Sequence, residues 1–222
     1  MSPEVFPIAL SLRIATLALA ITAPVGLALA WIQARKRYRG RSLVDGLILL
    51  PLVLPPSVVG FFLVVLLGRQ GVIGSWLDGV LGIRLVFTPA ASVIASALVA
   101  LPLLVKTVQP AFEAVPVELE DVGRSLGLGP VELFLRVTMP SAWRGILAGL
   151  VLAYARAIGE FGATLMFAGN IPGLTNTMPL EIFAAYQAGD DPRAFLYVAV
   201  LTGFSVVVVL SASRLTPRIE LR

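Results

Sequence analysis

Five apolar stretches, each close to the length of a membrane-spanning helix, run along the chain and are separated by more polar segments. They cover approximately residues 8–32, 43–67, 88–108, 145–167 and 194–212. Because a helix needs about 20 apolar residues to cross the hydrocarbon core of a bilayer, this pattern predicts an all-α membrane protein with about five transmembrane helices. No polar segment is long enough to fold separately, so we expect one transmembrane domain over residues 1–222.

The composition supports this class and removes many chemical functions. Hydrophobic residues make up 58% of the chain, charged residues make up 14%, and the mean hydropathy is +0.92. The absence of cysteine and histidine excludes disulfides, thiolate nucleophiles, imidazole bases and Cys/His metal sites. We therefore expect that the chain is not an enzyme and binds no metal or cofactor itself.

The first apolar stretch could be a secretory signal peptide that ends at the small residues Ala28 and Ala30, but its charges argue against that interpretation. A signal peptide carries positive charge before its apolar core, whereas this chain begins with Glu4 and has Arg13 inside the stretch. The basic residues follow the stretch instead, in the segment 35–41. We expect a retained helix.

The distribution of basic residues predicts how the chain is oriented. The net charge is +4. Basic residues gather in the segments 35–41 and 106–144 and in the tail, at Arg214, Arg218 and Arg222, whereas the other loops hold Arg69, Arg84 and Arg193. The positive-inside rule then places the N-terminus outside and the C-terminus in the cytoplasm, so that the segment of about 113–141 faces the cytoplasm. Because membrane orientation accounts for this charge, we do not expect nucleic-acid binding.

Several of the apolar stretches contain helix breakers. These are Pro24, Pro51, Pro55, Pro56, Pro102, Gly159 and Gly162. Proline and glycine are common in membrane helices, but a broken helix also frees backbone groups that lipid cannot satisfy, and such breaks normally lie inside a bundle or beside a water-lined path. We expect kinks or unwound turns there, and take Pro55, Pro56, Gly159 and Gly162 as candidates for a pathway or gate.

The polar segment between the third and fourth stretches predicts two short helices. Pro116 suits a first helical position, acidic residues follow it, and Gly127 suits the left-handed residue that ends a helix. Leu119, Val122 and Leu126 then form a buried apolar stripe on one face, with Glu120, Asp121 and Arg124 pointing elsewhere. Pro130 starts a second helix, which Pro140 stops. The alternatives are a solvated connector and a docking surface for a soluble partner.

This segment resembles the EAA loop of bacterial ABC importer permeases, in which Glu120, Gly127 and Pro140 occupy the matching positions. Departures from the usual pattern are Asp121, Val122, Gly123 and Met139. The resemblance implies a type I ABC importer permease fold, in which this loop is the coupling helix that sits in a groove of a cytoplasmic ATPase. The residues to which that role carries over are Val117, Leu119, Glu120, Asp121, Gly123, Arg124, Gly127 and Pro140.

Two further stretches resemble the molybdate branch of these permeases. One runs from Asp45 through Pro51, Pro55 and Pro56 to Gly60, and the other from Ala155 to Thr164, followed by Gly169-Asn170-Ile171-Pro172-Gly173 and Thr177-Met178-Pro179-Leu180. The resemblance implies transport of molybdate or tungstate. Sulfate permeases share the general plan and remain the alternative, although a tyrosine is expected there in place of Phe161.

The same resemblance implies partners. Neither of the two lysines, Lys36 and Lys106, follows a glycine, so the chain has no phosphate-binding loop and cannot be the ATPase. ATP and magnesium would be used by a separate subunit. The family implies a homodimer of this chain, two cytoplasmic ATPase subunits and an external oxyanion-binding protein, in the bacterial cytoplasmic membrane. A gradient-driven transporter or channel, and a membrane-embedded hydrolase, are the competing classes.

Arg156 and Glu160 are four residues apart on the predicted fourth helix and are expected to pair. One interpretation is a structural ion pair. The other is that Arg156 faces the pathway and attracts the oxyanion, with Glu160 limiting how tightly the oxyanion binds.

Overall fold

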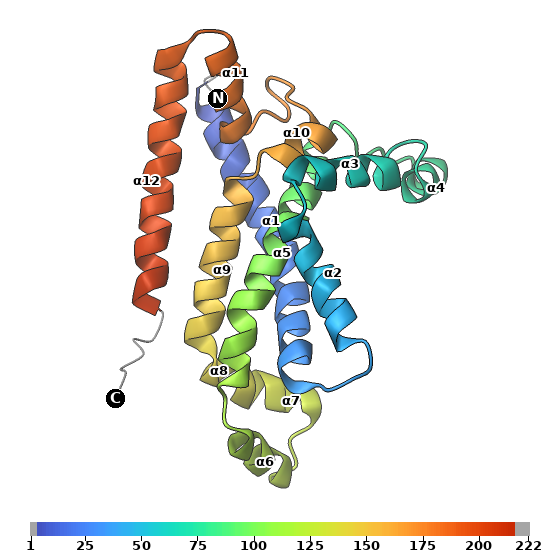
Figure 1. The fold of residues 1–222 in the computed structure, drawn as a ribbon, viewed down its shortest axis with the longest axis vertical. Coiled ribbons are helices and arrows are strands. Elements are labelled where there is room, and N and C mark those ends of the chain that lie inside the picture. Colours follow the sequence, from blue (N-terminus) through green and yellow to red (C-terminus); the bar gives the residue numbers. More distant parts are fainter. Residues whose placement is uncertain (1–3, 216–222) are drawn as a thin grey trace.

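The computed structural model describes residues 4–215, and these residues form helices joined by short loops (Figure 1). In chain order the helices are α1 (Val5–Arg35), α2 (Arg41–Val53), α3 (Pro56–Leu67), α4 (Val72–Leu81), α5 (Pro89–Glu113), α6 (Val117–Ser125), α7 (Pro130–Leu133), the π-helical turn η1 (Phe134–Thr138), α8 (Met139–Ser141), α9 (Trp143–Ile158), α10 (Gly162–Ala168), α11 (Met178–Gln187) and α12 (Asp191–Leu215).

Within the described residues, three helices are long and apolar enough to cross a membrane, and there are five spans if each bent pair counts as one. The three are α1, α5 and α12, and the bent pairs are α2 with α3 and α9 with α10. This confirms the expectation of an all-α membrane protein with about five transmembrane helices.

The core of the bundle lies where α5 packs between α1 and α9 (Figure 1). Small side chains allow a close approach: a Cβ atom added to Gly145 of α9 would lie 2.3 Å from the Cβ atom of Ala111 on α5. One turn further along α9, a Cβ atom on Gly149 would lie 2.5 Å from a methyl group of Val108. Alanine occupies many of the other buried positions, including Ala15, Ala18 and Ala153. These contacts hold α1, α5 and α9 together as the body of the molecule.

The prolines affect their helices unequally. Helix α1 continues through Pro24, and α5 continues through Pro102, so no unwound turn occurs at these two prolines. The break in the second apolar stretch falls at Leu54 and Pro55, which have extended backbone conformations, and Pro56 then occupies the first turn of α3. This proline position is favourable because the first helical N–H has no partner within the helix.

The second apolar stretch is therefore divided into two helices with a sharp bend between them. Helices α2 and α3 are bent by 111° relative to each other, and Figure 1 shows α3 running sideways across the direction of the long helices. The fourth stretch bends by a smaller angle, 54°, between α9 and α10. Helix α10 packs against α3, so the two bends form one layer across the bundle.

Two helices lie in segments that the sequence pattern assigned to loops. Helix α4 follows α3 and continues the sideways arm, and α11 packs against α12 at the end of the bundle where α1 begins (Figure 1). Both are ten residues long, which is too short for a span. The sequence does mark the ends of these helices, because Gly71 and Gly82 border α4 and Pro179 lies in the first turn of α11.

The first and last described helices of the chain are α1 and α12. Figure 1 shows the start of α1 at the end of the bundle opposite α6, and α12 running back from that end. In the basic tail, Arg218 and Arg222 lie outside the described residues, and Arg214 is described only as part of helix α12.

Candidate functional site

The first candidate site is the projecting segment between the end of α5 at Glu113 and the end of α8 at Ser141. Its first helix, α6, begins one residue later than expected, because Pro116 occupies the cap position before Val117. Gly127 has a φ of +85°, in the left-handed region that favours glycine, and this confirms the expected helix end.

Glu120 is the best anchored residue of this segment. Only 4% of the residue is exposed. Its carboxylate lies 3.1 Å from Nε of Arg35 at the end of α1, and it accepts a hydrogen bond of 2.8 Å from the hydroxyl of Thr138. Arg124 approaches the second carboxylate oxygen at 3.5 Å. The carboxylate thus joins α1, α6 and η1 through charged and neutral contacts.

Arg35 strengthens the same junction from the α1 side. One of its Nη atoms donates a hydrogen bond of 2.6 Å to the carbonyl oxygen of Val115, just before α6. Glu120 thus lies on another face of α6 than the stripe, as expected, and it points into the protein. Asp121 and Arg124 lie at the surface and pair with each other at 2.5 Å. No local pattern indicated the contact, since Arg35 and Glu120 are far apart in the sequence.

The apolar stripe of α6 faces outward. Leu119, Val122 and Leu126 are 47%, 59% and 77% exposed, and Val117 beside them is 51% exposed. The described part of the chain does not bury this stripe, so the expectation of a buried stripe is wrong for the chain alone. On the opposite side, a Cβ atom on Gly123 would lie 2.5 Å from a methyl group of Leu133, which brings α6 close to α7.

The second half of the segment is continuous and does not end at Pro140. Pro130 begins α7 as expected, but the helical path continues through η1 and reaches Ser141 in α8. Proline has no N–H to donate to the carbonyl four residues earlier, and the wider π-helical turn immediately precedes this position. Pro140 therefore lies inside the second helical path, and the path breaks at Ala142.

The second candidate site is the place where the two broken pairs meet. A Cβ atom on Gly162 would lie 2.9 Å from Cβ of Pro56, and one on Gly60 would lie 2.8 Å from the carbonyl oxygen of Ala163. The breakers Pro56 and Gly162 are thus brought into contact, although about a hundred residues separate them in the sequence.

The ion pair on α9 is part of this second site. An Nη atom of Arg156 lies 2.8 Å from a carboxylate oxygen of Glu160, which confirms the expected pairing. The other oxygen of Glu160 accepts a hydrogen bond of 2.8 Å from the backbone N–H of Ala163, in the first turn of α10. Gly159 caps α9, so Glu160 bridges the break between the two helices. Glu160 is 3% exposed.

The two sites stand at opposite ends of one helix. Helix α9 has 16 residues, a length of about 24 Å, and it connects the projecting segment directly to the break at Gly159. A displacement of the segment can therefore reach the second site through the turn at Ala142 and helix α9.

Comparisons with known proteins agree with this arrangement. The family described as the inner membrane component of binding-protein-dependent transport systems matches residues 22–221. The molybdenum transport system permease protein ModB of Escherichia coli (strain K12) is 42% identical over 211 residues, which are 94% of this chain and 92% of that protein. ModB of Haemophilus influenzae is 40% identical over 207 residues, 93% of this chain and 89% of that protein. The putative molybdenum transport system permease protein YvgM of Bacillus subtilis is 37% identical over 204 residues, 91% of this chain and 89% of that protein.

Solved structures share the fold at much lower identity. An amino acid ABC transporter has a TM-score of 0.62 at 19% identity, covering 96% of this chain and 94% of that chain. The MetNI methionine ABC transporter has the same TM-score at 15% identity and the same coverage. The fold is that of type I ABC importer permeases, and the chain belongs to the family of inner membrane components of binding-protein-dependent transport systems.

Proposed function

We propose that this chain is the permease subunit of an ATP-driven importer for molybdate, with tungstate as an equivalent cargo. The family membership and the names of its relatives support the transport function and the cargo. In this proposal two copies of the chain form the pathway, two cytoplasmic ATPase subunits use ATP and magnesium, and an external binding protein delivers the oxyanion. The chain lies in the bacterial cytoplasmic membrane with its N-terminus outside and its C-terminus inside.

The observation that carries the coupling role is the exposed apolar stripe on a firmly held helix. Leu119, Val122 and Leu126 offer an apolar surface to a soluble partner, while Glu120 fixes the helix to α1 from behind. A solvated connector would have neither feature. ATP-driven closure of the ATPase dimer would pull the two α6 helices together, and α9 would transmit that displacement to the break beside α3. This is rigid-body alternating access.

The proposed gate is the layer formed by α3 and α10. Both helices cross the direction of the spans at their breaks, where Pro55, Pro56, Gly159 and Gly162 lie, and they pack tightly against each other. Arg156 is half-buried beside this layer, and Glu160 neutralises its charge. Such an arrangement suits a pathway that must attract an oxyanion without retaining it.

The test begins with the chain tagged in its native membrane, gently solubilised and analysed by mass spectrometry for copurifying proteins. An ATPase with a phosphate-binding loop in equal amount supports the importer. The purified complex is then reconstituted into vesicles with its binding protein, and uptake of labelled molybdate is measured against excess sulfate. ATP-dependent uptake that sulfate does not reduce supports the proposal. Recovery of the chain alone, still active with an ion gradient, would contradict it.

A further inference from the structure

The sideways arm formed by α3 and α4 has an unusual distribution of polarity. On α4, the side chains of Val72, Ile73, Trp76, Val80 and Leu81 are 46% or more exposed and cover one side of the helix. The opposite side, with Gly74 and Asp78, packs against the protein. A helix on the surface of a water-soluble protein has the reverse arrangement, with its apolar side inward. The outward face of α4 therefore requires an apolar neighbour from outside the described chain.

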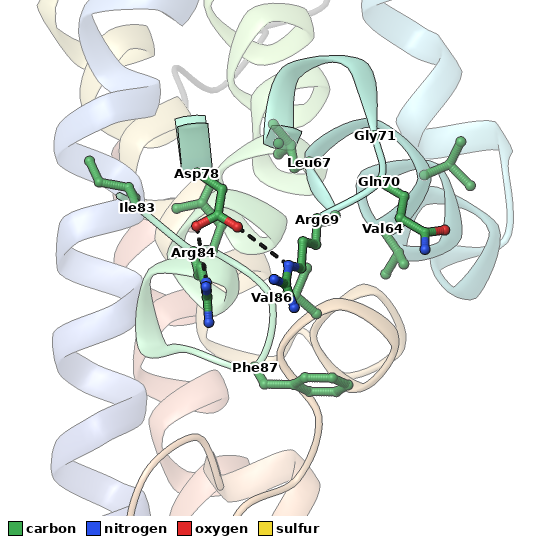
Figure 2. A pocket seen from close by; sticks show the side chains of 14 residues that line it. Val64, Leu67, Arg69, Gln70, Gly71, Asp78, Ile83, Arg84, Val86 and Phe87 are labelled. Carbon is green, nitrogen blue, oxygen red and sulfur yellow. Dashed lines mark hydrogen bonds and ion pairs between the residues drawn. The ribbon is translucent and has the colours of Figure 1, made fainter. Parts of the chain in front are cut away.

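The polar side of α4 is fixed by close packing and by charge. A Cβ atom on Gly74 would lie 2.0 Å from the carbonyl oxygen of Gly68, so α4 sits directly on the end of α3. Asp78 lies 3.0 Å from Nε of Arg84 and 3.5 Å from Nε of Arg69, as Figure 2 shows. These contacts leave no freedom for α4 to turn its apolar side toward the protein.

The two arginines carry more charge than Asp78 neutralises. Within the described residues, Asp78 is the carboxylate that contacts either guanidinium. The side chains of Arg69 and Arg84 are 75% and 65% exposed. Beside them lies a cavity of about 640 Å³ whose wall is largely apolar and includes Val64, Val86 and Phe87 (Figure 2). An apolar wall with cations at its rim matches a phospholipid, which has an acyl chain below an anionic phosphate.

The level of the arm fits the outer boundary of the membrane. Helix α1 has 31 residues and is about 46 Å long, whereas the hydrocarbon core is about 30 Å thick. If Arg35 and Lys36 mark the inner boundary, the outer boundary falls about 20 residues earlier, close to the exposed Arg13. Figure 1 shows the arm leaving the bundle below the end at which α1 begins, and not at its tip.

We propose that α4 is an interfacial helix that lies in the outer leaflet, with its apolar side among the acyl chains and with Arg69 and Arg84 bound to the phosphate of an anionic phospholipid. Its amphipathic pattern, a tryptophan in the apolar side and flanking arginines are the features of such helices. The lipid contact anchors the far end of α3. This inference rests on insertion in a membrane and is independent of which cargo is carried.

Photo-crosslinking from single positions tests the proposal in intact membranes. A photoreactive phenylalanine derivative, p-benzoylphenylalanine, replaces Trp76 or Val80, and the products are identified by mass. We expect adducts one phospholipid heavier than the chain. A crosslink to a second copy or to another protein would overturn the proposal. The absence of any adduct at both positions, as expected for side chains surrounded by water, would also overturn it. A crosslink to a second copy would leave the proposed homodimer intact, so the two ideas are separable.

Two control positions define what the products mean. Val207 on α12 is 62% exposed and faces outward in the middle of a span, so its lipid adduct shows that the chemistry is detected. Ser75, on the polar side of α4, should give far less lipid adduct than Val80. Equal yields from Ser75 and Val80 would contradict the assigned orientation of the helix.

The phosphate contact is tested in vesicles of phosphatidylethanolamine and phosphatidylglycerol with the reconstituted complex. With the photoreactive residue at Ile83, which lines the cavity together with both arginines, we expect the adduct to be enriched in the anionic lipid relative to the vesicle composition. The Arg69→Gln/Arg84→Gln variant should lose that enrichment while still giving lipid adducts. Asp78→Asn, which frees both guanidiniums, should increase it. Unchanged enrichment in the arginine variant would refute the phosphate contact.

Discussion

Replacing Glu120 by glutamine tests whether its buried contact with Arg35 holds the projecting segment in place. The substitution keeps the size of the side chain and an oxygen that accepts the hydrogen bond from Thr138. It removes the charge that faces Arg35 at 3.1 Å. Because only 13% of the Arg35 side chain is exposed, its guanidinium is left with little water to replace the carboxylate.

The expected cost follows from what remains of the junction. Breaking a buried ion pair by removing one partner costs about 3–5 kcal/mol. Here the hydrogen bond of Thr138 and that of Arg35 to Val115 survive, so we take a lower value of about 2–3 kcal/mol. That free energy corresponds to about a 30- to 150-fold increase in the population of the detached segment.

Hydrogen exchange followed by mass spectrometry measures this population directly in the reconstituted complex. Exchange of the α6 amides through local opening should become faster by that factor, and ATP-driven uptake should fall with it. Glu118→Gln is the matched control, since Glu118 lies on the same helix and is exposed. In addition, Arg35→Met combined with Glu120→Gln should cost less than the two single changes together.

Equal exchange rates in Glu120→Gln and Glu118→Gln would refute the reasoning. Strict additivity of the Arg35 and Glu120 changes would do the same, because it would mean that the two charges do not interact. Faster exchange with unchanged uptake would instead mean that the contact between Glu120 and Arg35 holds α6 in place but is not required for transport.

Three further predictions concern the second site and the helix end. Gly60→Ala places a methyl group 2.8 Å from the carbonyl oxygen of Ala163 and should reduce uptake by separating α3 from α10, at a cost of about 1–3 kcal/mol, whereas Gly46→Ala, with open space around it, should not. Gly127→Trp strains a left-handed residue and adds bulk at the proposed docking surface on α6, so ATP hydrolysis should continue while uptake is lost. Gly129→Ala is its control, and normal uptake by the tryptophan variant would count against docking. Arg156→Gln leaves Glu160 unpaired and should lower the uptake rate at unchanged expression, and a normal rate would remove Arg156 from the pathway.

The spans and their breaks were predictable because they depend on composition and on local backbone chemistry. Apolar length gave the number of spans, and Pro55 and Gly159 marked where two of them break. The size of each bend was not predictable, since two prolines stop a helix without fixing the direction of the next one. The 111° bend depends on α3 packing against α10, which is a tertiary contact.

In the projecting segment, too, local features were predictable from the sequence and contacts between distant residues were not. Capping residues and the φ of Gly127 follow from local rules, and they were predicted. The burial of Glu120 depends on Arg35, which reaches it from another helix, and the sequence pattern alone did not indicate this contact. Helix α4 was missed because ten residues, one of which is the charged Asp78, are too few to register as a span.

The close approach of α5 to α9 at Gly145 and Gly149 has a mechanical consequence. Helices in which the glycines of one pack against side-chain atoms of the other at such short range resist sliding and tilting, so we expect α1, α5 and α9 to turn as one rigid body. A rigid body rotates through the same angle at both ends, and therefore a few degrees of rotation imposed at the projecting segment reach the opposite end of the bundle undiminished. The helices that border this rigid body, which are α3, α4 and α12, are then the elements past which it moves.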